Sequence, residues 1–188
     1  TPVNGDGICN GAVDNASGIA GLVTLAQAYK KAGAPDRSIV FLAVTAEESG
    51  LLGSKYYAEN PIFPLGQTVG GVNMDSLNPN GPAKDIVVVG RGKSELDAYL
   101  EKIAKAANVT IVDEPTPEKG FYYRSDHFSF AKLGVPFFNF GAGEDLVAGG
   151  KEAGKKAAED YEKNRYHAPA DEYEAITNWG GMMSDLRL

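Results

Sequence analysis

The chain has 188 residues, of which 43% are apolar, and this predicts one globular domain with a sizeable core. Its formal net charge of -7 argues against nucleic acid and anionic membrane surfaces as partners, because both would repel it. No apolar run approaches about 20 residues, the length that crosses a bilayer, so we expect no membrane insertion. The single cysteine, Cys9, allows no internal disulfide.

The apolar pattern alternates between helical and extended segments, which is typical of an α/β domain. Residues 16–32 carry one apolar helical stripe and are followed by Gly33, a residue that often ends helices. The run SIVFLAV at 38–44 predicts a central strand covered on both faces. A second helix is predicted at 94–107. Further strands of a mixed sheet are predicted at 69–74, 85–90 and 136–140.

Acidic residues stand where predicted strands pass into loops. Glu47 and Glu48 follow the first predicted strand, Asp75 follows the next, and Asp14 precedes the first helix. In open α/β sheets ligands bind outside the carboxyl ends of the strands, so we expect these side chains at one site. Together with His167 they provide ligands for a divalent metal and leave one carboxylate as a base. The pattern predicts a metallohydrolase.

Each of these residues also has an ordinary interpretation when it is taken alone. Asp14 could cap the helix that follows it, and Asp75 could begin a turn. The Glu47–Glu48 pair could be solvated, and His167 could be a surface histidine. Their joint occurrence favours one shared metal site over four independent explanations.

The motifs NGAVDNASG, AEESGLLGS, NMDS, YRSDHFSFAKLGVP and YHAPADEY occur in this order. They resemble those of the co-catalytic di-zinc aminopeptidases of the bacterial leucyl aminopeptidase type, and the resemblance spans nearly the whole chain. It implies an α/β fold, a three-layer αβα sandwich around a mixed, mostly parallel central sheet. It also implies that residues 1–188 form a single zinc peptidase catalytic domain.

The resemblance implies a role for each residue of the expected metal site. Asp14 would bridge two Zn²⁺ ions, Glu48 and His167 would complete one of them, and Asp75 would bind the other. Glu47 would be the general base. In this family the peptide bond after the bridging aspartate is often cis, so we expect the bond that follows Asp14 to be a candidate for that geometry.

Other residues have less certain roles at this point. Tyr166 and Tyr122 each resemble tyrosines that donate a hydrogen bond to the developing oxyanion, although either could be an aromatic rim residue without a catalytic role. His127, in the SDH motif, is expected to line or brace the pocket. Asp171 and Ser125 could orient ligands or could act as ordinary caps.

The chain departs from the family pattern at its start. The family's first ligand is a histidine in a His-x-Asp motif that would precede the segment Gly5–Asp6, and the chain begins after that position. One zinc is therefore expected to lack a ligand, and the domain is expected to lack its N-terminal strands. We expect the chain to be part of a longer protein and to be inactive or weakly active as it stands.

The resemblance implies a metal-dependent exopeptidase, most directly an aminopeptidase acting on peptides with a free N-terminus. Two Zn²⁺ per intact domain and a secreted or periplasmic location would accompany that activity. Carboxypeptidases and dipeptidases of the same fold are alternatives. Two further alternatives are a non-catalytic protein-binding module and a single-zinc glutaminyl cyclase-like acyltransferase. The presence of Asp14, Glu48, Asp75 and His167 favours the two-metal peptidases.

Overall fold

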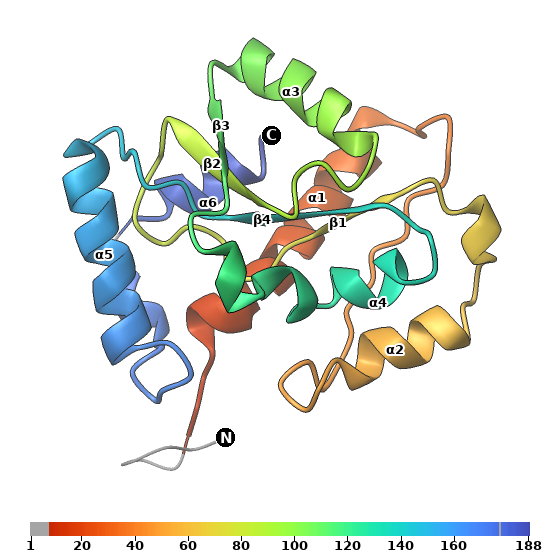
Figure 1. Ribbon diagram of the computed structural model, residues 1–188, viewed down its shortest axis with the longest axis horizontal. Helices are drawn as coiled ribbons and strands as arrows, with labels where there is room; N and C mark the ends of the chain where they lie inside the picture. The colour runs from red at the N-terminus through yellow and green to blue at the C-terminus, as the bar shows by residue number, and fades with distance from the viewer. Residues whose placement is uncertain (1–7, 177) are drawn as a thin grey trace. The chain divides into compact units, whose positions relative to one another are not determined.

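The computed structural model describes residues 8–176 and 178–188 (Figure 1). Its helices are α1 (Gly18–Ala32), α2 (Leu52–Glu59), α3 (Leu96–Ala107), α4 (His127–Ala131), α5 (Gly150–Asn164) and α6 (Gly180–Asp185). Its strands are β1 (Gly71–Asn73), β2 (Asp85–Val89), β3 (Thr110–Asp113) and β4 (Phe137–Gly141). Short helical turns are η1 (Ala12–Ser17), η2 (Leu65–Gln67), η3 (Pro117–Lys119), η4 (Phe121–Tyr123) and η5 (Tyr173–Ala175). None of the helices in this part of the chain is both long and apolar enough to cross a membrane.

The chain folds into two compact units, each of which is built from segments distant in sequence. The sheet unit comprises Ala43–Met74 and Ile86–Gly141. The helical unit comprises the described residues of Thr1–Leu42, Asp75–Asp85 and Ala142–Leu188. That residues 1–188 act as one catalytic domain stays a prediction.

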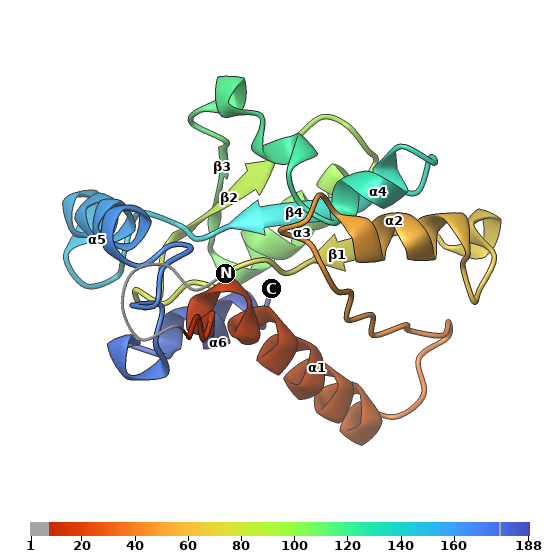
Figure 2. The ribbon, with the colours of Figure 1, turned by 90° about the horizontal axis from the view of Figure 1, so that it is seen from below.

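The sheet has four strands in the order β1-β4-β2-β3. Strands β1 and β4 run parallel, with Val72 beside Phe138, and β2 runs antiparallel to β4. Along β2 buried and half-buried side chains alternate, and Ile86 and Val88 enter the core. Helix α3 lies on one side of the β1–β4 pair, and α2 and α4 lie side by side on the other (Figures 1 and 2). The predicted α/β class and the mixed sheet are confirmed.

A small polar and aromatic core joins α2, α4 and β4 in the sheet unit. Ser54 Oγ donates a hydrogen bond to Ser129 Oγ at 2.9 Å, and both side chains are buried. The Phe130 ring stacks on Phe137 with 4.7 Å between centroids and meets Tyr57 at 6.0 Å. Each buried hydroxyl thus has a partner, and the aromatic rings fill the space between helix and strand.

In the helical unit, α6 packs closely against the segment 75–85. The Asn78 amide donates a hydrogen bond to Asp185 Oδ2 at 2.8 Å. A Cβ at Gly181 would collide with the carbonyl oxygens of Asn78 and Gly81, so only glycine lets the two backbones approach this far.

The helices with clear apolar stripes form where the sequence predicts them. Helix α1 corresponds to the predicted 16–32 and α3 to 94–107. Asn108, in the left-handed conformation, ends α3, and the Val109 amide donates back to the Ala104 carbonyl at 2.8 Å. The strands predicted at 69–74, 85–90 and 136–140 appear as β1, β2 and β4.

The predicted central strand at 38–44 is wrong. None of these residues belongs to a strand of the described chain, and the side chains of Ile39, Val40 and Phe41 are 41%, 48% and 38% exposed. An apolar, β-branched run shows that a segment suits a buried strand, but it does not provide the neighbour with which the strand must pair. Phe41 instead lies near the Tyr29 ring of α1, with 6.4 Å between centroids.

The bond between Asn78 and Asp185 generates a prediction about pH. Burial raises the pKa of Asp185 to about 6, above its ordinary value of 3.8. The folded state therefore disfavours the ionised carboxylate, and the contribution of Asp185 to the free energy of unfolding should fall as pH rises from about 4 to about 6 and then level off. The expected loss is about 2–3 kcal/mol.

Denaturant unfolding of the unsubstituted protein and of Asp185→Asn, measured between pH 4 and pH 7, tests this expectation. The asparagine oxygen still accepts from the Asn78 amide but carries no charge, so the variant should be more stable above pH 6 and nearly equal near pH 4. A stability difference that does not change with pH would contradict the prediction.

Candidate metal centre

Asp14 and His167 come together in the helical unit. Asp14 lies in η1 and His167 in the turn that follows α5, and Asp14 Oδ2 is 3.2 Å from His167 Nε2. Two such ligands on one tetrahedral zinc ion would be separated by about 3.3 Å. The Asp14 side chain is only 11% exposed, whereas that of His167 is 45% exposed. The pair can therefore hold one cation.

Hydrogen bonds to the backbone place Asp14. Gly11 adopts the left-handed conformation with φ 57°, and a Cβ there would collide with the Asp14 carbonyl oxygen. The Asp171 carboxylate accepts from the amides of Val13 and Asp14, each at 3.0 Å. The peptide bond between Asp14 and Asn15 is cis, as predicted.

An aromatic ring holds the His167 imidazole. Tyr166 stacks on it with 3.8 Å between ring centroids and 26° between planes. His167 itself adopts a left-handed backbone with φ 55°, which is uncommon for a residue with a side chain and occurs often at functional sites. Tyr166 thus contributes packing to the site.

Asp75 begins a segment that is tied to the Asp14 turn. Asn15 Oδ1 accepts from the Ser76 amide at 3.2 Å as well as from the Gly18 amide at 3.0 Å. The next amide, that of Leu77, donates to Ser17 Oγ at 3.0 Å. Two side chains of η1 therefore fix the backbone that immediately follows Asp75.

Glu47 and Glu48 lie in the sheet unit, in the turn that leads into α2. The Glu47 carbonyl accepts from the Gly50 amide at 2.9 Å and from the Leu51 amide at 2.8 Å. Ala46 precedes the pair with φ 57°, a left-handed conformation that non-glycine residues rarely adopt. That these two glutamates meet the Asp14–His167 pair stays a prediction. Gly5–Asp6, the segment expected to follow a missing histidine ligand, lies outside the described residues.

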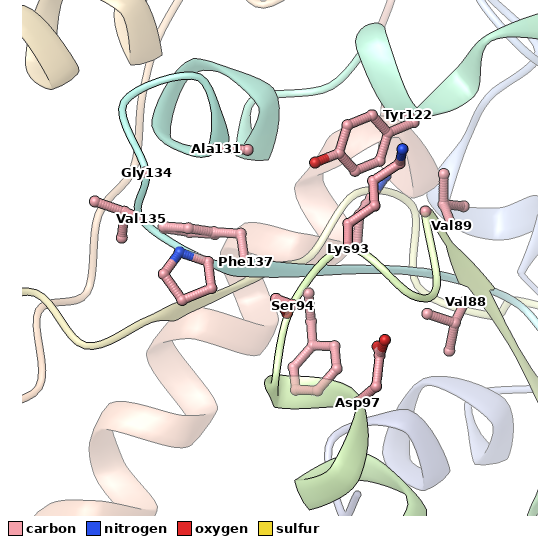
Figure 3. Close-up of a pocket in the computed structure, with 14 residues that line it drawn as sticks. Val88, Val89, Lys93, Ser94, Asp97, Tyr122, Ala131, Gly134, Val135 and Phe137 are labelled. Carbon is pink, nitrogen blue, oxygen red and sulfur yellow. The ribbon is translucent and has the colours of Figure 1, made fainter.

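Tyr122 lies beside a cavity of about 140 Å³ in the sheet unit, lined by β2, β4 and the ends of α3 and α4 (Figure 3). Its walls include Val135 and Phe137, and Lys93 Nζ lies 4.7 Å from the Tyr122 ring centroid. Burial raises the pKa of the Tyr122 hydroxyl, which therefore stays protonated at neutral pH and can donate a hydrogen bond.

The SDH motif packs behind Tyr122. His127 is 1% exposed, and its ring meets the edge of Tyr122 at 5.0 Å between centroids. Burial lowers the pKa of His127 to about 4, so the imidazole is neutral at pH 7. A neutral, enclosed ring fits the expected bracing role.

Two hydrogen-bonded groups of polar side chains were not predicted from the sequence. Tyr161 of α5 donates its hydroxyl to Asp171 Oδ2 at 3.4 Å, and nothing in the local sequence points to that contact. Asn73 Nδ2 donates to Ser125 Oγ at 2.7 Å and to Asn139 Oδ1 at 3.2 Å. A polar residue inside each of two apolar strands was the signal that could have revealed the second network.

Gly90 allows the Tyr122 ring to occupy its place, which generates a second prediction. A Cβ at Gly90 would collide with that ring, and the backbone there has φ 78°. Gly90→Ala should therefore lower the free energy of unfolding twice, by about 1–2 kcal/mol for the left-handed alanine and by about 1–3 kcal/mol for the displaced ring.

Gly92→Ala separates these two contributions. Gly92 has φ 85°, and a Cβ there would meet nothing within 4 Å, so this variant carries the backbone penalty alone. Denaturant unfolding should rank the unsubstituted protein above Gly92→Ala, and Gly92→Ala above Gly90→Ala. Equal loss in both variants would mean that the ring moves aside freely.

Known proteins resemble this chain over most of its length. It is 28% identical to leucine aminopeptidase 2 of Arthroderma otae over 187 residues, which is 93% of this chain and 36% of the relative. It is 29% identical to leupeptin-inactivating enzyme 1 of Streptomyces exfoliatus over 144 residues, which is 76% of this chain and 31% of that enzyme. The chain thus spans about a third of the length of these relatives.

Solved structures share the fold. The aminopeptidase from Aneurinibacillus sp. strain AM-1 superimposes with a TM-score of 0.66 at 24% identity, over 95% of this chain and 38% of that one. LapB from Legionella pneumophila gives a TM-score of 0.68 at 20% identity, over 97% of this chain and 46% of that one. The sequence pattern of Peptidase family M28 matches residues 2–184. The chain therefore belongs to Peptidase family M28.

Proposed function

We propose that this chain carries the metal centre of a zinc-dependent aminopeptidase. Its family consists of zinc-dependent peptidases, and relatives over most of its length are named aminopeptidases. The observation that carries the proposal is the Asp14–His167 pair, whose oxygen and nitrogen lie 3.2 Å apart. Carboxylate and imidazole are the donor types that zinc binds in catalytic sites.

The remaining ligands come from acidic residues of the family motifs. In the proposal Glu48 would hold one ion together with Asp14 and His167, and Asp75 would hold a second ion together with Asp14. Asn15 supports this arrangement, because its side chain accepts from the amide directly after Asp75 and so limits how far that segment can move from the Asp14 turn.

Bound zinc would supply Lewis acidity, which polarises the scissile carbonyl and lowers the pKa of water. The Glu47 carboxylate accepts the proton of the attacking water and returns it to the leaving amine. The hydroxyl of Tyr166 or of Tyr122 donates a hydrogen bond to the oxygen on which negative charge develops. The raised pKa of Tyr122 keeps that donor protonated.

The substrate in this proposal is a peptide with a free N-terminus. Its ammonium group would bind among the carboxylates of the site, which also contribute to the acidic net charge of the chain.

Adjacent glutamates permit a matched test. Glu47→Gln should keep zinc binding and lower kcat on a leucine anilide by about 100- to 10,000-fold, because it removes only the base. Glu48→Gln should weaken zinc binding, because it removes a charged ligand. Zinc per chain and hydrolysis are measured together, in this chain and in any N-terminally longer form of the protein.

Removal of the metal completes the experiment. A chelator should abolish hydrolysis, and added zinc should restore it in the unsubstituted protein and not in Glu47→Gln. Hydrolysis that survives complete zinc removal, or a protein that binds no zinc in any form, would contradict the proposal.

A further inference from the structure

Asp171 accepts hydrogen bonds from the backbone amides of the Asp14 turn. Its carboxylate accepts from Val13 at 3.0 Å and from Asp14 at 3.0 Å, and its carbonyl oxygen accepts from Ala12 at 3.1 Å. Three consecutive amides therefore point at one residue that is only 2% exposed. An ordinary cap accepts from amides two or three positions away, whereas these donors lie more than 150 residues earlier in the chain.

The same residue is also close to the second ligand along the chain. Asp171 ends the turn that contains His167, where the Ala168 amide donates to the Arg165 carbonyl and the Asp171 amide donates to the Ala168 carbonyl, each at 3.0 Å. One short turn thus carries His167 and the carboxylate that fixes Asp14. A shift of Asp171 would alter the distance between the two ligands.

Tyr161 links Asp171 to the Tyr166 ring, which stacks on the His167 imidazole. Its hydroxyl donates to Asp171 Oδ2 at 3.4 Å, and its ring lies 6.1 Å from Tyr166, which stacks on His167. Burial, together with the nearby charges of Asp171 and Asp14, raises the pKa of Tyr161 far above its ordinary range. The Tyr161 hydroxyl therefore stays protonated at neutral pH and can donate to Asp171.

We propose that Asp171 is a positioning residue of the metal centre: by binding the Val13 and Asp14 amides it sets the separation of the Asp14 carboxylate and the His167 imidazole. This inference rests on the proposed function, because the separation matters only where the two side chains share a metal ion. In this proposal Asp171 acts without contact to the metal, the substrate or the reacting atoms. Its effect passes through the backbone of Asp14.

Asp171→Asn tests the proposal with little change of volume. The carboxamide offers one acceptor oxygen, and its NH₂ group would face a backbone N–H. We expect amide hydrogen exchange at Val13 and Asp14 in the metal-free protein to accelerate at least about tenfold. The dissociation constant for zinc, measured by competition with a chelator, should rise by about 10- to 100-fold. In the zinc-loaded protein kcat should fall while KM stays within about twofold, because substrate binding is not touched.

Glu172→Gln is the control. Glu172 is the neighbouring carboxylate, and it accepts from Asn10 Nδ2 at the exposed surface, with bonds of 2.9 Å and 2.8 Å. This variant removes the same charge one residue away and should leave zinc affinity and exchange at Val13 and Asp14 unchanged. A loss of affinity equal to that of Asp171→Asn would show that charge alone matters and would overturn the proposal.

Tyr161→Phe gives a second, milder variant. It removes the donor to Asp171 and keeps both backbone bonds, so it should weaken zinc binding less than Asp171→Asn and in the same direction; if Asp171→Asn does not fold, this variant decides the question. Unchanged zinc affinity in a folded Asp171→Asn, with faster exchange at Val13 and Asp14, would reject a positioning role. Absence of zinc binding by the unsubstituted protein would overturn the proposed function, and this inference with it.

Discussion

The geometry of the candidate metal centre depends on how the buried Asp171 carboxylate finds hydrogen-bond donors. Asp171 is nearly inaccessible to water, and a buried charge without partners would be strongly destabilising. The amides of Val13 and Asp14 and the Tyr161 hydroxyl donate hydrogen bonds to it. The bonds that make the buried carboxylate tolerable therefore also fix the backbone of Asp14, the proposed metal ligand. Gly11 makes this possible, because its left-handed conformation turns the chain into η1 without a Cβ that would collide with the Asp14 carbonyl. The hydrogen bonds to Asp171 therefore contribute both to the stability of this part of the helical unit and to the geometry of the candidate site.

The same kind of contact fixes the segment that begins at Asp75. No regular strand carries this segment in the described chain; the side chains of Asn15 and Ser17 accept from its first amides in place of a neighbouring strand. At its far end the Asn78 amide binds Asp185 on α6. Side-chain acceptors spaced along η1 and α6 thus hold an irregular backbone at defined points. Irregular backbone can place a carboxylate where a regular element would not, but it needs such acceptors because each buried amide must find a partner.

Local sequence pattern located two helices and one strand of the fold. The apolar stripes of α1 and α3 and the β-branched run of β2 (Asp85–Val89) identified these elements because side-chain period follows backbone geometry. The segment 38–44 has an equally strong pattern and forms no strand, since pairing depends on a neighbour that the segment does not specify. The prediction that Asp14 and His167 are metal ligands came from motif resemblance. Their 3.2 Å approach joins residues far apart in the chain, and no spacing rule gives such a distance. Asp171 could be named from sequence as a candidate orienting group, but its partners could not.

The sheet unit contains a polar network at the end of β1, just before Asp75. Strand β1 ends at Asn73, two residues before Asp75, and the Asn73 amide group donates to Ser125 and to Asn139 of β4. Asn73 and Asn139 are also register partners in the parallel pair. A leucine of similar size at Asn73 would remove both hydrogen bonds, whereas the asparagine ties β1 to Ser125 of the SDH motif and to Asn139 of β4. The chain therefore enters Asp75 from a strand end held by side-chain hydrogen bonds and leaves it into a segment held in the same way. Asp75 needs no regular secondary structure of its own to have a defined backbone on both sides.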